Sequence, residues 1–110
     1  QVTGYAEGLG VDVKFVHSNI EGEVINALYE AHEDGTDAAL MNPAGYTTTT
    51  GPIRAAISQV GFPVIEVHAS NPTSRGTVST IQPVCKGSVY GFGVYGYYLA
   101  LEAVKRIAGN

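Results

Sequence analysis

The stretch Pro63-Val64-Ile65-Glu66-Val67-His68-Ala69-Ser70-Asn71 decides the fold, because apolar residues lead directly into polar ones. It predicts a buried strand whose polar side chains emerge at or near its carboxyl edge. A second apolar stretch, residues 38–41, runs in the same way into Asn42 and a threonine-rich loop. In open α/β sheets, ligands bind in the crevice at this edge. The two strand ends are therefore predicted to form two walls of one site.

Strand and helix patterns alternate along the rest of the chain. Strands are predicted at residues 11–16 and 84–90, a loop at 71–83, and helices at residues 20–31, 52–60 and 94–107. Such alternation predicts a parallel sheet with helices on both faces. The length of 110 residues suits one domain that spans residues 1–110.

The bulk composition excludes several classes of protein. The chain is 45% hydrophobic and 15% charged, which supports a folded core. A net charge of −4 without a basic run argues against a nucleic-acid partner. No apolar stretch approaches the ~20 residues needed to span a bilayer, so no membrane partner is expected. The single cysteine, Cys85, excludes an internal disulfide and favours the cytoplasm.

The leading candidate for acid–base chemistry is His68, at the end of the strand predicted at residues 64–67. A neutral imidazole there can donate or accept a proton near pH 7. The alternative is a structural histidine that bonds to a neighbouring loop. Asn42 holds the equivalent place on the other strand, where its amide binds a ligand hydroxyl or merely closes an Asx turn. His17, His32 and His68 lack metal-ligand spacing, so no metal is expected.

Several polar groups near these strand ends are candidates for substrate binding. The backbone at Ala69 and Ser70, with the Ser70 hydroxyl, is a candidate anion-binding concavity. Arg75, in the polar loop, is better placed than Arg54 to clamp a carboxylate. The threonine run 47–50 either caps a helix or offers hydroxyls to a polyol ligand.

Gly91, Gly93 and Gly96 form a G-x-G-x-x-G pattern between the last strand and the last helix. The pattern falls at the last strand–helix junction, with no room after it for the βαβ unit and the acidic residue about 20 positions further on that a dinucleotide site requires. The pattern therefore favours close packing of helix on sheet, and no nucleotide cofactor is expected.

Three motifs in register resemble those of the type II 3-dehydroquinate dehydratase family. Residues 42–49, N-P-A-G-Y-T-T-T, resemble the family's N-P-G-A-Y-T-H-T. Residues 66–71, E-V-H-A-S-N, resemble E-V-H-I-S-N, and residues 91–101 are similar to G-x-G-x-x-G-Y-x-L-A-L. The order and spacing hold from about Leu9 onward.

The resemblance implies a flavodoxin-like three-layer α/β fold and a homo-oligomer built from trimers, up to a dodecamer. It also implies a cofactor-free lyase that dehydrates 3-dehydroquinate, a cyclic hydroxy acid, through an enolate in the shikimate or quinate pathway. By resemblance, His68 protonates the leaving hydroxyl, and Asn42 holds ring hydroxyls. The backbone N–H groups of Ala69 and Ser70 grip the carboxylate.

The chain departs from the family at several positions. Thr48 replaces a histidine, and Ala55 replaces an aspartate that reaches a neighbouring subunit. Arg75 is a candidate to stand in for the arginine of an F-R-x-x-S motif. These changes leave open two alternatives: a binding or assembly subunit, and a diverged enzyme in which the smaller Thr48 accepts another cyclic hydroxy acid.

The family's opening strand and its mobile lid, with an arginine and the base tyrosine, have no counterpart in this sequence, and Tyr5 is not that tyrosine. The chain as written is therefore expected to be inactive or poorly active. In the flavodoxin-like order 2-1-3-4-5 the missing strand is central. Without it, the strand at residues 11–16 is expected to lack a neighbour and the strand at 38–41 to have a bare edge. We expect a longer natural chain to supply that strand.

Overall fold

The computed structural model describes residues 8, 10, 12–17, 20–44, 47–48 and 51–108. Their centre is a sheet of four parallel strands in the order β1-β2-β3-β4. The strands are β1 (Val13–Val16), β2 (Ala38–Met41), β3 (Val64–His68) and β4 (Gly87–Tyr90). Because all four are parallel, their carboxyl ends meet at one edge of the sheet.

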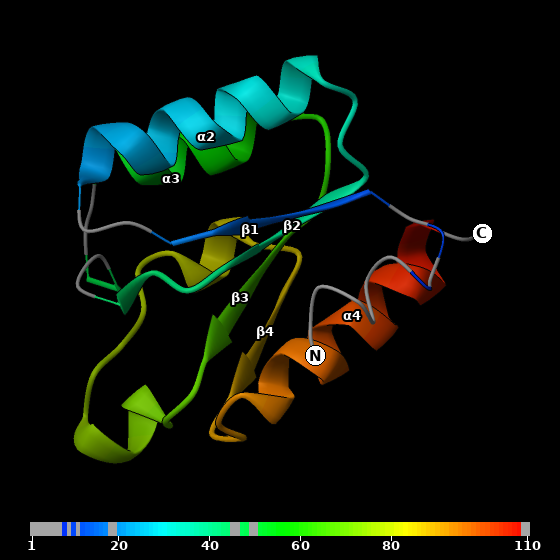
Figure 1. Cartoon of the computed structure of the whole chain (residues 1–110). Coiled ribbons are helices and arrows are strands. Elements are labelled where there is room, and N and C mark those ends of the chain that lie inside the picture. The colour runs from blue at the N-terminus through cyan, green and yellow to red at the C-terminus, as the bar shows by residue number, and fades with distance from the viewer. Residues whose placement is uncertain are drawn as a thin grey trace.

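Helices cover both faces of this sheet, as the sequence predicts. Helices α2 (Glu21–Glu33) and α3 (Pro52–Gln59) lie side by side on one face, and α4 (Tyr95–Ala108) lies on the other (Figure 1). Successive strands advance in one direction across the sheet, so right-handed crossovers place α2 and α3 on the same face. The three-layer α/β architecture is confirmed.

Two apolar cores separate the three layers. The core on the α2 and α3 side includes Leu28, Met41 and Ile53, each at most 1% exposed. The core on the α4 side includes Leu40 and Leu101, which are fully buried. Alternate residues of a strand point to opposite faces, so β3 sends Ile65 and Val67 toward α4 and Val64 toward α3.

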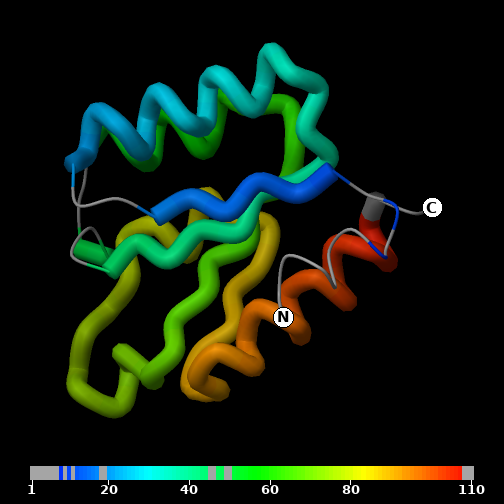
Figure 2. Tube along the Cα trace, viewed as in Figure 1, coloured from blue at the N-terminus to red at the C-terminus, as the bar shows by residue number. Residues whose placement is uncertain are grey.

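The expected gap beside the strand at residues 11–16 is absent from the structure. Strand β1 pairs directly with β2, from Val13 opposite Ala38 to Val16 opposite Met41. Strand β2 is therefore paired on both edges (Figure 2). The physical reason is that buried backbone N–H and C=O groups need partners, and the edge of β2 offers them in register. The expectation of an unpaired strand and a bare edge is wrong for this chain.

The segment that joins β3 to β4 contains no α-helix. It forms two short 3₁₀ helices, η2 (Pro72–Arg75) and η3 (Gln82–Val84). Strand β4 consequently begins later than the predicted residue 84; Pro83, which lacks an N–H group, lies within η3. This connection leaves part of the sheet face over β3 and β4 free of helix. None of the described helices is long and apolar enough to cross a membrane.

Candidate active site

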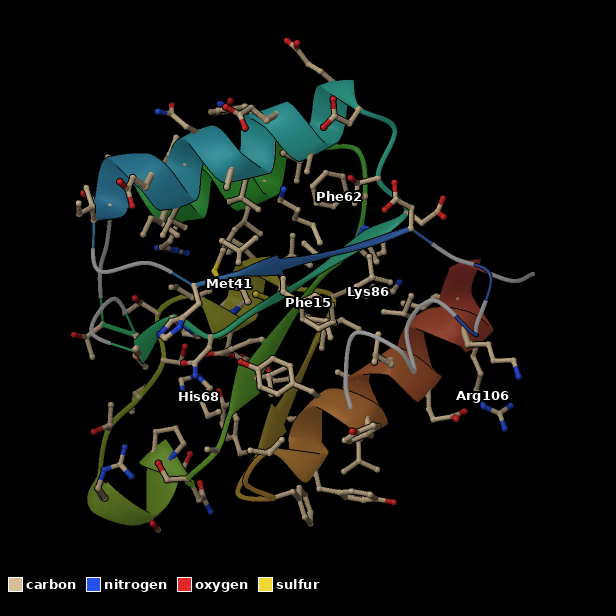
Figure 3. The ribbon with its side chains drawn as sticks, viewed as in Figure 1. Phe15, Met41, Phe62, His68, Lys86 and Arg106 are labelled. Carbon is tan, nitrogen blue, oxygen red and sulfur yellow. The ribbon has the colours of Figure 1, made fainter. Side chains whose placement is uncertain are left out.

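A histidine and a carboxylate form a bonded pair at the carboxyl end of β3. Figure 3 shows His68 at this end of the sheet, whereas Lys86 lies at the opposite end. Glu66 and His68 are two residues apart on the strand, so their side chains share a face. The His68 Nε2 lies 2.5 Å from Glu66 Oε2. Because Nε2 donates to the carboxylate, Nδ1 is the ring nitrogen left to exchange a proton with a ligand.

Glu66 is fully buried, and its carboxylate accepts hydrogen bonds from four side chains. His68 Nε2 and Ser79 Oγ donate to Oε2, the latter at 2.6 Å. Ser88 Oγ and Tyr90 Oη donate to Oε1 at 2.8 and 3.1 Å. A buried charge is costly unless its oxygens are hydrogen-bonded, and here both are. The network therefore holds an ionised carboxylate in the interior.

The electrostatics of this cluster follow from the same contacts. Burial alone raises the pKa of Glu66, but the hydrogen bonds from Ser79, His68 and Ser88 and the charge of His68 outweigh it, and the pKa is lowered. Burial and the nearby Glu66 charge raise the pKa of Tyr90. Glu66 thus remains an acceptor, and Tyr90 remains a neutral donor, over the physiological pH range.

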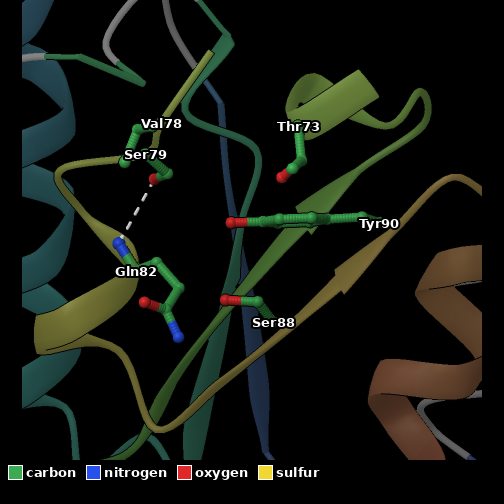
Figure 4. Close-up of a pocket in the computed structure, with 6 residues that line it drawn as sticks. All are labelled: Thr73, Val78, Ser79, Gln82, Ser88 and Tyr90. Carbon is green, nitrogen blue, oxygen red and sulfur yellow. Dashed lines mark hydrogen bonds between the residues drawn. The ribbon is translucent and has the colours of Figure 1, made fainter. Parts of the chain in front are cut away.

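A cavity of about 450 Å³ lies over β4, on the sheet face that carries Glu66. Figure 4 shows Ser88 and Tyr90 projecting from β4 toward Ser79 and Gln82, which belong to the connection between β3 and β4. Thr73 and Val78 complete the lining. Most of these side chains carry hydroxyl or amide groups, so the cavity suits a polar, hydroxylated ligand.

Ser70 and Arg75 meet directly after the end of β3. The Arg75 guanidinium donates to Ser70 Oγ at 2.9 Å, and both residues are exposed. The short helix η2 brings them together, because Asn71 caps it by accepting a hydrogen bond from the Thr73 N–H at 3.1 Å. An exposed guanidinium beside a hydroxyl offers donors to an anion. Arg75 therefore lies beside the end of β3, and its role in binding a carboxylate stays a prediction.

The other predicted site residues are less closely tied to His68. Asn42 Oδ1 accepts a hydrogen bond from the Ala44 N–H at 3.0 Å, which is the Asx-turn alternative. Ala44 has a positive φ of 42°, so this turn is tight. Thr48 is exposed, and no described contact joins it or Asn42 to the Glu66–His68 pair.

The glycine pattern after β4 packs the last helix, as predicted. A Cβ atom on Gly96 would lie 3.3 Å from a Val67 methyl group and 3.4 Å from one of Val89. Gly91 and Gly93 have positive φ angles of 90° and 58°. Their N–H groups bond to the carbonyls of His68 and Ala69, so this turn also braces the end of β3.

Ser79, Ser88 and Tyr90 received no role from sequence reasoning, and Glu66 was noted only as one polar residue of its strand. The i, i+2 spacing of Glu66 with His68 and of Ser88 with Tyr90 was a usable signal, since it places each pair on one face. The register, with Glu66 opposite Ser88 and His68 opposite Tyr90, came only from the structure.

The described residues contain no group of three or more His, Cys, Asp or Glu side chains that could hold a metal ion. Cys85 lies in the bend before β4 and not within the strand, where it was expected. Burial and the charge of Glu66 raise the pKa of its thiol to about 12. The thiol is therefore a poor nucleophile.

The fold and the site define an α/β protein with an acid–base pair at the carboxyl edge of a parallel sheet. Comparison with known proteins narrows this class, because the family described as Dehydroquinase class II matches residues 1–105. The chain belongs to this family.

Curated relatives in the family are named 3-dehydroquinate dehydratase. The chain is 41% identical over 104 residues to the one from Lachnoclostridium phytofermentans, covering 92% of this chain and 72% of the relative. It is 48% identical over 103 residues to the one from Caldanaerobacter subterraneus, covering 91% and 69%. The crystal structure of type II dehydroquinase from Butyrivibrio crossotus matches with a TM-score of 0.84 and 34% identity, over 94% of this chain and 74% of that one.

Proposed function

We propose that the chain is a lyase of the type II dehydroquinase family that dehydrates 3-dehydroquinate in the shikimate pathway. Membership of the family and the shared name of its relatives support this reaction. The single structural observation that carries the proposal is the bonded Glu66–His68 pair at the carboxyl edge of the sheet. Loss of water requires a group that protonates the departing hydroxyl, and a histidine held by a carboxylate can supply that proton.

The proposed roles of the site residues follow their positions. His68 is the general acid: as the imidazolium it donates its Nδ1 proton to the departing hydroxyl, while its Nε2–H stays bonded to Glu66. Arg75 and Ser70, with the backbone N–H groups of Ala69 and Ser70, bind the substrate carboxylate. Asn42 and Thr48 contact ring hydroxyls in the bound state, which requires the Asn42 side chain to share or exchange its bond to Ala44. The enolate intermediate and the absence of a cofactor are parts of the same proposal.

The test is turnover of 3-dehydroquinate, followed by the absorbance of the conjugated enone product. We expect His68→Ala to lower kcat by roughly 10²–10⁴-fold, the usual contribution of a general acid. His32→Ala is the matched control, because His32 lies in the last turn of α2, away from the carboxyl edge. A kcat of His68→Ala equal to that of His32→Ala would overturn the assignment.

The same proposal covers assembly, location and pathway. A homo-oligomer built from trimers, up to a dodecamer, is supported by exposed aromatic residues around the start of α4; Phe92 and Tyr95 are 59% and 63% exposed. A cytoplasmic location is supported by the free thiol of Cys85.

A role in quinate breakdown, which uses the same reaction, is the alternative to biosynthesis. Binding of 3-dehydroquinate without turnover would favour a binding or assembly subunit.

A further inference from the structure

We infer that Tyr90 is a positioning residue for the proposed acid, holding the Glu66–His68 pair in one arrangement through both its ring and its hydroxyl. The inference rests on the proposed function only for its effect on the rate. The arrangement itself is a property of the folded chain.

Tyr90 contacts both members of the pair. It lies opposite His68 in the register of β3 and β4, and the two rings meet edge to face, with centroids 4.9 Å apart and planes at 85°. This is a favoured geometry for aromatic rings. The Tyr90 hydroxyl lies 3.1 Å from Glu66 Oε1. One side chain therefore restrains the rotation of the imidazole and of the carboxylate.

The two oxygens of Glu66 have separate partners, and this separation selects the tautomer of His68. Oε1 accepts from Ser88 and Tyr90, which leaves Oε2 for His68 and Ser79. With the carboxylate fixed, neutral His68 carries its proton on Nε2. Without the Tyr90 hydroxyl, Oε1 keeps only the Ser88 donor, and the carboxylate gains freedom to rotate. We then expect a mixture of tautomers, of which only the Nε2–H form leaves Nδ1 free to take up the proton that the resulting imidazolium donates to the substrate.

The experiment compares Tyr90→Phe, which keeps the ring and removes the hydroxyl, with Tyr90→Leu, which removes both. Tyr97→Phe is the matched control, since Tyr97 packs against Phe15 on the α4 side of the sheet. Long-range ¹H–¹⁵N NMR of the imidazole reports the tautomer of His68 in every variant, whether or not the chain is active. Thermal melting confirms that each variant is folded.

We expect one dominant Nε2–H tautomer in the parent chain and in Tyr97→Phe, and a mixture in Tyr90→Phe. On the proposed substrate, kcat of Tyr90→Phe falls about tenfold, the rate equivalent of one lost hydrogen bond to a charged group, while KM changes less than twofold. Tyr90→Leu is slower still. We also expect the pH profile of kcat to shift in Tyr90→Phe, because the profile reports the titration of the Glu66–His68 pair. The titratable groups beside this pair are Tyr90 on β4 and Cys85 before it.

An unchanged His68 tautomer in folded Tyr90→Phe would overturn the inference, even if the chain is an active dehydratase. A tautomer shift in a chain without dehydratase activity would support the positioning role while the proposed function failed. An unchanged kcat and pH profile in an active Tyr90→Phe would show that only the aromatic ring matters, which also contradicts the role of the hydroxyl.

Discussion

At the scale of single residues, Glu66 is the unusual member of this chain, because a carboxylate occupies the middle of a fully buried strand. Four donors surround it, and they come from β3, from β4 and from the connection between them. The residue thus joins segments that lie far apart in the sequence. Its charge also acts on its neighbours, raising the pKa of Cys85 and of Tyr90.

Glu66→Gln is expected to destabilise the fold by about 1–3 kcal/mol at pH 7. The four side chains that donate to the charged carboxylate would then meet a neutral amide, whose NH₂ group cannot accept a hydrogen bond. The pKa of Glu66 is lowered from 4.5 in the folded state, so its ionisation stabilises the fold above pH 4.5. That stabilisation is lost as pH falls below 4.5 through the folded pKa. Urea unfolding of parent and variant at pH 7 and at pH 3 measures it. A difference in unfolding free energy that does not shrink on acidification would contradict the prediction.

The Cys85 thiol is expected to resist alkylation in the folded state. With a pKa of about 12, its thiolate fraction at pH 8 is about a thousandfold below that of an ordinary thiol. The measurement is the rate of iodoacetamide labelling of the native chain, with the chain unfolded in guanidinium as the control. Equal rates in the two states would show that neither burial nor Glu66 suppresses ionisation.

At the scale of elements, β3 and β4 present different chemistry to the two faces of the sheet. Val67 and Val89 point toward α4, where Gly96 lets the helix approach. Glu66, His68, Ser88 and Tyr90 form a polar block on the opposite face. The connection between these strands contains no α-helix, and it leaves that block beside a cavity. The polar site is open to a ligand because no α-helix joins β3 to β4 on this face.

Gly22 and Gly96 form a matched pair for testing the approach of α4, because each is the second residue of its helix. A Cβ on Gly22 meets nothing within 4 Å, so Gly22→Ala is expected to stabilise the chain by about 0.5–1 kcal/mol through helix propensity. Gly96→Ala gains the same propensity but crowds two β-branched side chains, which are stiff.

We therefore expect Gly96→Ala to be less stable than Gly22→Ala by at least about 1 kcal/mol in denaturant unfolding, the low end of the cost of overpacking a core. If the two alanine variants are equally stabilised, α4 is free to shift and does not pack tightly on β3 and β4.

At the scale of the whole molecule, the layers bury both faces of the sheet, yet large apolar side chains remain outside. Three of them lie within four residues at the start of α4, and each is at least 59% exposed: Phe92, Val94 and Tyr95. Such a group on a small domain is typical of a contact surface. It is the feature of the described structure that best supports self-association.

Replacing both Phe92 and Tyr95 by Ser is expected to lower the assembled mass toward the 11.5 kDa of a single chain. Light scattering after size-exclusion chromatography measures this mass. Ile107→Ser, near the opposite end of α4 and 39% exposed, is the control and is expected to leave assembly unchanged. An unaltered mass in the double variant would place any interface elsewhere.

Some parts of the fold and of the site could be predicted from the sequence, and others could not. The buried strand at residues 64–67, the helix at 20–31 and the packing role of Gly96 were predictable, because apolar periodicity and glycine spacing are local. Ser70 and Arg75 were each predicted to bind an anion, but the contact between them was seen only in the structure. The late start of β4 was not predicted, since Val84 and Cys85 are compatible with a strand in sequence but lie in and directly after η3.

By itself, the sequence determined the alternation of strands and helices and the family, and it made His68 the leading candidate for acid–base chemistry. These follow from local patterns and short motifs, which persist whatever the rest of the chain does. Only the tertiary structure decided that β1 pairs with β2, and that Ser79, Ser88 and Tyr90 converge on Glu66. Strand register brings Ser88 and Tyr90, 22 and 24 residues away, to Glu66, and the folded connection brings Ser79; both are set by the packing of the whole sheet and not by any local pattern.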